Sequence, residues 1–286
     1  MPGLLLGHFL IDCVAQDPNW GPEPPVAPYG TNPLPSERVV LPLTFPVLGT
    51  PRWQDGYGEM RKGFLHTGID IRAPKMTPIV APFSGTLGMK RYSFWIYGDN
   101  GWLTLGTHLN DDTPGTNDNR GERDTMFAPD ISPGCHVYEG QFLGYVGDSG
   151  DATAPHLHFE IYAPGEGATA GRIRNPFPSL LKARVIKEPV VRFRQFHPLP
   201  APDMLRLQGC VRKVDPAKRF VTIQLTAKLL HSGEASPVTV PRYVRLTAYE
   251  PEILSSLQRV APTQSVGFYV SAKGPLGDQR IVRILL

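Results

Sequence analysis

The sequence predicts a mainly β protein of two domains, and three observations lead to this prediction. Glycine and proline supply 29 and 31 of the 286 residues, well above average usage, which favours many turns between short strands. Apolar residues occur in short or alternating runs rather than at helical spacing. The length exceeds what one hydrophobic core usually serves, so we expect two compact units.

Charge and hydropathy exclude several classes of protein. The formal net charge is only +3, and charged residues make up 19% of the chain, so no nucleic-acid partner is expected. No apolar run is long enough for a membrane-spanning helix. Heptad and Gly-X-Y repeats are absent as well, which excludes coiled coils and collagen. A monomer is favoured.

Residues 1–38 are predicted to form a separate N-terminal segment. An apolar stretch at 4–11 is followed by the small residues Cys13 and Ala15, as in a secretory signal, but the basic start of such a signal is missing. A signal peptide and a frayed or mis-started terminus therefore stay open as alternatives. Seven prolines lie within residues 17–35, which predicts an extended linker or arm.

Residues 39–171 are predicted to form the first domain. Short runs bounded by glycine, proline and aspartate predict strands, which we place at 77–81, 86–89, 102–108 and 142–146. The polar stretch 110–133 is too long for a hairpin turn and indicates a functional surface loop.

Residues 172–203 are a proline-bearing basic linker, and residues 204–286 are the second domain. Strand-like runs follow one another there, at 205–214, 220–225, 243–249, 266–272 and 280–285. Within the second run, Val221, Ile223 and Leu225 alternate with polar residues. A chain of five such strands is typical of a small OB-like β-barrel.

Chemistry-bearing residues gather in the first domain, where four of the eight histidines occupy three short segments. In the first segment, an extended backbone puts His66, Gly68 and Asp70 on one face. A histidine and a carboxylate then point the same way. We expect Gly68 to leave room above the backbone for an ion or a substrate chain.

The second and third segments contribute the other three histidines. His108 stands alone in the second. In the third, His156, His158 and Glu160 share one face of an expected strand. The opposite face is apolar and is made by Leu157, Phe159 and Ile161. Such a strand buries its apolar face in a core and presents two imidazoles outward.

These residue types fit a metal site. Catalytic zinc takes three ligands from histidine and carboxylate and keeps a fourth position for water. Thiolate ligation is not predicted, because the three cysteines never form a C-x-x-C pair. A single histidine in a β protein is more often an ordinary polar residue than a ligand. Five candidate groups in three coherent segments nevertheless predict a metal site.

The ordered set of motifs resembles a known family. The string H-x-G-x-D within 63–81, continued by Thr77-Pro78-Ile79-Val80-Ala81, is similar to the lysostaphin/LytM-type zinc peptidases of bacterial cell walls. Downstream, Thr107-His108-Leu109 resembles the isolated histidine of that family, and the H-x-H at 156–158 resembles its signature. The resemblance covers residues 45–162.

The resemblance implies roles for the candidate residues. His66, Asp70 and His158 would bind Zn²⁺, while His108 and His156 would be the catalytic pair beside the metal. One histidine of the pair would accept a proton from water and the other would steady the developing oxyanion. Which histidine does which stays open. The implied fold is a mainly antiparallel β-sheet of duplicated hybrid motif type, with a groove above it.

The resemblance also implies a function. We expect a zinc metalloendopeptidase that hydrolyses peptide stems or cross-bridges of peptidoglycan outside the cytoplasm, whether secreted, periplasmic or wall-associated. Peptidoglycan peptides are its expected partners. The alternative is a non-enzymatic wall-binding or scaffolding protein that uses the same groove, although such relatives typically lose metal ligands.

Two features depart from the family pattern. Ala154 stands where the family usually has glycine. The stretch 110–133 is longer and more polar than the usual link, and we expect a solvated loop that walls the groove and narrows the substrate range. Its many carboxylates leave a Ca²⁺ site as the alternative, although their spacing matches no EF-hand loop.

Overall fold

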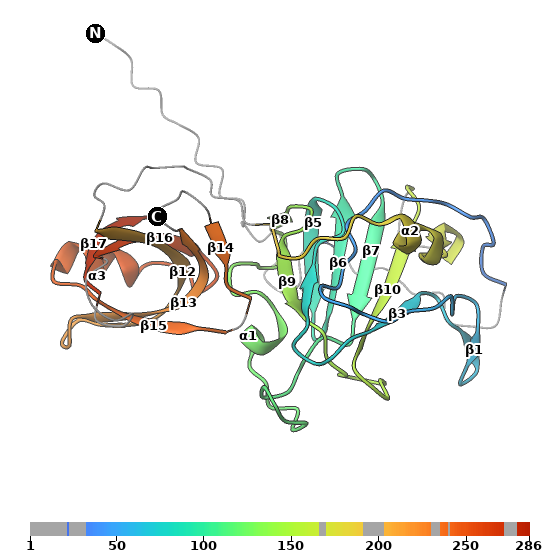
Figure 1. The fold of residues 1–286 in the computed structure, drawn as a ribbon, viewed down its shortest axis with the longest axis horizontal. Coiled ribbons are helices and arrows are strands. Elements are labelled where there is room, and N and C mark those ends of the chain that lie inside the picture. The colour runs from blue at the N-terminus through green and yellow to red at the C-terminus, as the bar shows by residue number, and fades with distance from the viewer. Residues whose placement is uncertain are drawn as a thin grey trace, which may run out of the picture.

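The computed structural model describes residue 22 and residues 33–165, 170–190, 203–229, 235–239, 241–271 and 279–286. Its strands form two main groups, one within residues 60–174 and the other within 204–285 (Figure 1). The prediction of a mainly β fold is confirmed. The N-terminal stretch 4–15, for which a signal peptide and a frayed terminus stay open, lies outside the described residues, as do most of the proline-rich arm and residues 191–202 of the linker. No helix in the described ranges has the length and hydropathy to cross a membrane.

A seven-stranded antiparallel sheet carries the histidines. Its main path is β11-β10-β7-β6-β5-β8, and β3 also pairs with β10. The strands are β3 (Ile69–Arg72), β5 (Gly85–Lys90), β6 (Ser93–Gly98), β7 (Leu103–Thr107), β8 (His136–Val137), β10 (His156–Tyr162) and β11 (Ile173–Arg174). Because β10 pairs with both β3 and β7, His158 stands opposite Asp70 on one side and Thr107 on the other.

Two small sheets and two helices complete this part of the chain. β1 (Met60–Arg61) pairs with β2 (Phe64–Leu65), and β4 (Pro78–Val80) pairs with β9 (Phe142–Tyr145). The helices are α1 (Arg123–Met126) and α2 (Phe177–Lys182), and a 3-10 turn covers Ala170–Arg172. Strands occur within or beside all four ranges predicted here. The sequence reading missed β6, although its run Ser-Phe-Trp-Ile-Tyr is rich in strand-forming aromatic and branched residues.

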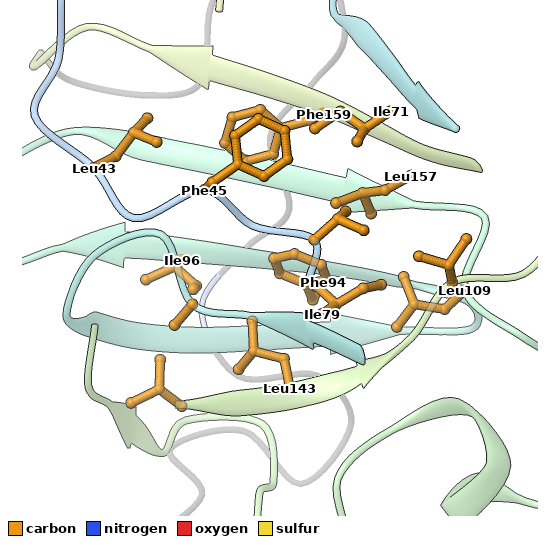
Figure 2. Packing of buried hydrophobic residues seen from close by; sticks show 14 of the residues in the cluster. Leu43, Phe45, Ile71, Ile79, Phe94, Ile96, Leu109, Leu143, Leu157 and Phe159 are labelled. Atoms are coloured by element: carbon orange, nitrogen blue, oxygen red, sulfur yellow. The ribbon is translucent and has the colours of Figure 1, made fainter. Parts of the chain in front are cut away.

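The alternation of β10 fixes which of its faces is buried. Leu157, Phe159 and Ile161 are fully buried, as predicted. Figure 2 shows the first two among other core side chains such as Phe45 and Phe94. Burying each such side chain contributes about 1.5–3 kcal/mol. A shift of one residue in the β10 register would expose this face and bury the imidazoles, so the core holds the histidines in place.

The second sheet has six strands and its own hydrophobic core. The strands are β12 (Met204–Asp215), β13 (Phe220–Leu229), β14 (Ala235–Pro237), β15 (Tyr243–Thr247), β16 (Ser265–Ser271) and β17 (Ile281–Leu285). All five predicted strands are present. The short β14 and helix α3 (Pro251–Leu257) were not predicted. The two main core clusters share no residue. Within the range predicted as linker, however, β11 pairs with β10 and Leu180 of α2 lies in the first core. The division at 39–171, 172–203 and 204–286 stays a prediction.

The predicted barrel needs one correction. The order β15-β13-β12-β16-β17 agrees with an OB-like arrangement, and β15 meets β17 at one parallel bridge between Thr247 and Arg280. Within the described ranges, however, no strand ladder closes the ring. Besides this one bridge, the described residues of β15 and β17 do not pair. The sheet is therefore open.

The polar stretch 110–133 is anchored rather than fully solvated. Asn110 and Asp112 are each only 1% exposed. The ammonium of Lys75 contacts Asp112 Oδ2 at 2.5 Å and Asp148 Oδ1 at 2.7 Å. These carboxylates and Asp111 form the acidic cluster of this region. Lys75 thus supplies the positive charge beside these carboxylates that a Ca²⁺ ion would otherwise supply.

Candidate metal centre

Three segments bring His66, Asp70 and His158 together. His66 Nε2 lies 3.0 Å from Asp70 Oδ1 and 3.0 Å from His158 Nδ1, and the last two atoms are 3.1 Å apart. His66 precedes β3, Asp70 lies on β3, and His158 lies on β10. The cluster therefore depends on the pairing that sets Asp70 opposite His158. The predicted extended segment is shorter than expected, because β3 begins only at Ile69.

Hydrogen bonds fix how the two imidazoles face this cluster. His66 Nδ1 lies 2.8 Å from the carbonyl oxygen of Gly56, and His158 Nε2 lies 2.9 Å from Glu160 Oε1. Those oxygens only accept hydrogen bonds, so each facing ring nitrogen carries a proton. In the neutral rings, His66 Nε2 and His158 Nδ1 then carry lone pairs that point at each other and at Asp70 Oδ1. A positive charge must lie among these atoms.

Without a metal, a proton supplies that charge. Burial lowers the pKa of His158, but its hydrogen bonds to Asp70 and Glu160 outweigh burial and raise the pKa to about 9. Burial likewise raises the pKa of Asp70, yet hydrogen bonds from His158 and His66 hold it well below its ordinary value. The cluster is thus built around an ionised carboxylate and a compensating cation.

The donor set fits zinc. Ligands about 2.0–2.2 Å from a tetrahedral zinc ion lie roughly 3.3 Å from one another, close to the 3.0–3.1 Å found here. Two histidine nitrogens and one carboxylate oxygen form a three-ligand set of the catalytic type. The histidines are held by a carbonyl and a carboxylate, as ligand histidines usually are.

His108 and His156 lie beside the cluster. Their ring centroids are 4.7 Å apart, and His156 Nε2 is 3.5 Å from Asp70 Oδ1. His108 Nδ1 lies 2.7 Å from the Ser149 carbonyl oxygen, and His156 Nδ1 lies 2.7 Å from that of Ala154. Both Nδ1 atoms therefore donate, which leaves each Nε2 free to accept a proton.

The pKa shifts of this pair favour the neutral form. Burial lowers the pKa of His108 to about 4, against an opposing hydrogen bond to Ser149. Burial also lowers the pKa of His156 below its usual range. At neutral pH both rings are uncharged and can act as bases.

His108 has an unusual backbone. Its φ is +68°, in the left-handed region, which costs a residue with a side chain about 1–2 kcal/mol. It directly follows the end of β7 at Thr107. Strain of this kind persists where the surrounding structure enforces it and is often found at functional sites. No motif in the sequence marked this conformation.

Gly68 serves close packing rather than open space. A Cβ on this residue would lie 2.4 Å from the carbonyl oxygen of Phe159 and 3.0 Å from His158 Cε1. The expectation that Gly68 leaves room for an ion or a substrate is therefore wrong. The room is filled by β10, and glycine allows the segment that bears His66 to approach the strand that bears His158.

Replacing Gly68 with alanine is expected to lower the free energy of unfolding by about 1–3 kcal/mol and to weaken zinc binding, because β10 must shift. Urea denaturation and zinc titration measure the two effects. Gly171→Ala is the matched control, since a Cβ there meets no atom within 4 Å. Equal stability of the two variants would contradict the packing role.

Glu160 connects the cluster to the interior. It is 2% exposed, and its carboxylate accepts hydrogen bonds from His158 Nε2, from the Thr67 hydroxyl and, at 2.5 Å, from the Tyr162 hydroxyl. Burial raises the pKa of Glu160, but the hydrogen bond from His158 and the other donors hold it below the ordinary value. The sequence reading placed Glu160 on the histidine face without a role. The sequence did contain a signal for this role: Glu160 lies two residues after the predicted ligand His158, on the same face of the strand.

Glu160→Gln is expected to weaken zinc affinity by about 10–100-fold, the usual effect of losing the carboxylate that orients a ligand histidine. The fold should persist because the amide keeps the side-chain volume. Competition with a chromophoric chelator measures the affinity. The exposed Glu252 in the second sheet domain serves as control through Glu252→Gln. An unchanged affinity in Glu160→Gln would remove Glu160 from this role.

Comparison with known proteins identifies relatives of this region. Residues 64–170 match the model of Peptidase family M23. The chain is 28% identical over 150 residues to "DD-carboxypeptidase/endopeptidase Mpg" of Neisseria meningitidis and of Neisseria gonorrhoeae, covering 50% of this chain and 31% of theirs. It is 27% identical over 116 residues to "Cell division protein DipM" of Caulobacter vibrioides, covering 38% and 16%. The chain thus matches less than a third of the length of these relatives.

Solved structures of similar proteins include the catalytic domain of lysostaphin from Staphylococcus simulans. That comparison gives 22% identity and a TM-score of 0.36, covering 46% of this chain and 92% of that one. Helicobacter pylori Csd3 gives 22% identity and a TM-score of 0.34, covering 54% and 38%.

Proposed function

Residues 64–170 form a domain of peptidase family M23, and from this premise we propose that the chain is a zinc-dependent endopeptidase that hydrolyses peptide bonds of bacterial peptidoglycan. One observation carries the proposal. The lone pairs of His66 and His158 and the carboxylate of Asp70 meet within 3.0–3.1 Å of one another, next to two neutral histidines. A cation and a pair of bases are what metal-assisted hydrolysis needs.

The residues divide the chemistry between them. His66, Asp70 and His158 would hold the zinc ion, which supplies a Lewis acid and makes water a stronger nucleophile at neutral pH. His156 has its Nε2 3.5 Å from Asp70, so it can accept a proton from a water molecule at the cluster. The ring of His108 lies 4.7 Å from that of His156 and 6.3 Å from that of His158, centroid to centroid. The Nε2 of His108 is unprotonated at neutral pH, so it must first take up a proton from solvent or from the attacking water before it can donate a hydrogen bond to charge on the substrate carbonyl.

Both bases are prepared for this work. Their Nδ1 atoms are committed to the carbonyl oxygens of Ser149 and Ala154, so neither ring can turn without losing its hydrogen bond. Their lowered pKa values keep Nε2 unprotonated before reaction. Orientation and protonation state are therefore set before a substrate arrives.

Several facts support peptidoglycan as the substrate and the wall as the place of action. The Neisseria relatives are named DD-carboxypeptidase/endopeptidase, and the Caulobacter relative is named a cell division protein. We therefore place the chain outside the cytoplasm. The alternative, a non-enzymatic binding or scaffolding protein, gains no support, because the described residues retain the complete set of metal-binding and basic groups.

Incubating the purified protein with cell walls of several types tests the proposal. New peptide ends should appear and should vanish when a chelator is added, then return with added zinc. Release that is insensitive to chelator, or the absence of release from every wall type, would overturn the assignment.

A further inference from the structure

A pocket of about 210 Å³ opens next to the metal centre. It shares His66 and Asp70 with that centre. The remainder of its lining includes Trp53 and the arginines 52, 61 and 72. Three guanidinium groups around one small pocket are a strong concentration of positive charge in a chain whose formal net charge is only +3.

Two of these arginines, Arg52 and Arg72, are held side by side by backbone hydrogen bonds. Arg52 and Arg72 form an antiparallel bridge, with N–H donors 2.9 and 2.8 Å from the opposite carbonyl oxygens. Both residues are exposed. Within the part of the chain that the structure describes, neither guanidinium forms an ion pair. The charge of these two side chains is therefore available to a ligand.

Arg61 differs because it has carboxylate neighbours. Its Nη2 lies 2.9 Å from Glu59 Oε2 and 3.6 Å from Asp70 Oδ2. These two carboxylates face three guanidinium groups, and a metal ion on Asp70 adds further positive charge. The pocket as a whole is therefore electropositive.

Two hydrogen-bond donors in the lining have no acceptor. Trp53 Nε1 and Arg61 Nε are buried, and neither has a partner among the described residues. A buried donor without a partner costs about 1–3 kcal/mol. A ligand that brings acceptor oxygens into the pocket would remove this cost. Carboxylate is the group that also matches the forked geometry of guanidinium.

We propose that this pocket binds a carboxylate of the peptide substrate, held by Arg52 and Arg72 and by the free donors of Trp53 and Arg61. The proposal rests on the proposed peptidase function of the adjacent centre. Because the pocket and the centre share His66 and Asp70, the bound carboxylate must lie within a residue or two of the bond that is cut. The chain would thus select anionic peptides over neutral ones.

A synthetic stem pentapeptide tests this selection in three forms. One form has free carboxylates, one has its C-terminal carboxylate amidated, and one has its internal carboxylate amidated. The two amides distinguish a terminal carboxylate from an internal one. Isothermal titration with the full chain gives the Kd of each form, and product analysis gives kcat and KM separately.

Amidation at the recognised position should weaken binding to the unmodified chain at least tenfold and act mainly on KM. Arg52→Gln and Arg72→Gln should each reduce the discrimination severalfold, and the double substitution should remove it. Arg38→Gln is the matched control, since Arg38 is exposed and lies outside the pocket. It should behave like the unmodified chain.

Equal binding of all three forms by the unmodified chain, or no measurable binding of any, would overturn the proposal. So would an Arg38→Gln effect as large as that of Arg72→Gln. If the free acid binds preferentially but no form is cut, the peptidase function fails while the carboxylate pocket stands. If the forms are cut equally well, the function stands and the pocket assignment fails.

Discussion

His158→Ala is expected to abolish zinc binding and peptide hydrolysis together. The substitution removes Nδ1, one of the three atoms that meet within 3.0–3.1 Å. It also leaves Glu160, 2% exposed, without its hydrogen bond from His158 Nε2. Loss of an outer carboxylate alone weakens zinc by about 10–100-fold, so loss of the ligand should exceed that range. Zinc content after dialysis and release of peptide ends measure the two results.

Two further variants make this result decisive. His136→Ala removes a histidine that pairs with Asp99 at 2.9 Å, away from the cluster, and should retain zinc and activity. Asp70→Asn keeps the side-chain volume but removes the negative charge that the cluster needs, and should lose zinc without unfolding. Stoichiometric zinc in both His158→Ala and Asp70→Asn would show that the metal binds elsewhere.

The sequence alone was sufficient for the parts of the site that depend on strand alternation. In β10, apolar and polar residues alternate, so the burial of Leu157 and the outward direction of His156 and His158 follow from the pattern. Five of the six strands of the second sheet were predicted from short strand-like runs in the same way. A closed barrel did not follow, because closure depends on pairing between β15 and β17, which are distant in the chain and meet at a single bridge within the described residues.

The parts that were missed depend on contacts between distant segments. The proton positions on His66, His108 and His156 are set by carbonyl oxygens of loop residues, and no local pattern identifies which carbonyl a ring will meet. Open space was expected above Gly68, because nothing in the adjacent sequence shows that the Phe159 carbonyl oxygen of β10 would lie 2.4 Å from a Cβ at this position.

The arginine pocket was invisible for the same reason. Arg52 and Arg72 are twenty residues apart in the chain, and they become neighbours only through an isolated bridge outside regular strand pairing. The position of these arginines therefore becomes known only from the structure. The histidines of β10, in contrast, are placed by strand alternation and can be predicted from the sequence.

His156→Ala is expected to abolish turnover while zinc stays bound. Its Nε2 is 3.5 Å from Asp70, beyond a normal hydrogen bond, so the ligand set does not depend on this ring. The lowered pKa of His156 keeps Nε2 unprotonated at neutral pH. Removal of a general base typically costs about 10²–10⁴-fold in rate. We expect kcat to fall by that amount, with KM and zinc content little changed.

His108→Ala separates the two members of the pair. If His156 accepts the proton and His108 stabilises charge in the same step, the losses from the two single substitutions should not add in the double variant, because each acts only when the other is in place. Additive losses would mean that the histidines serve separate steps. Full activity in His156→Ala would exclude His156 as the base.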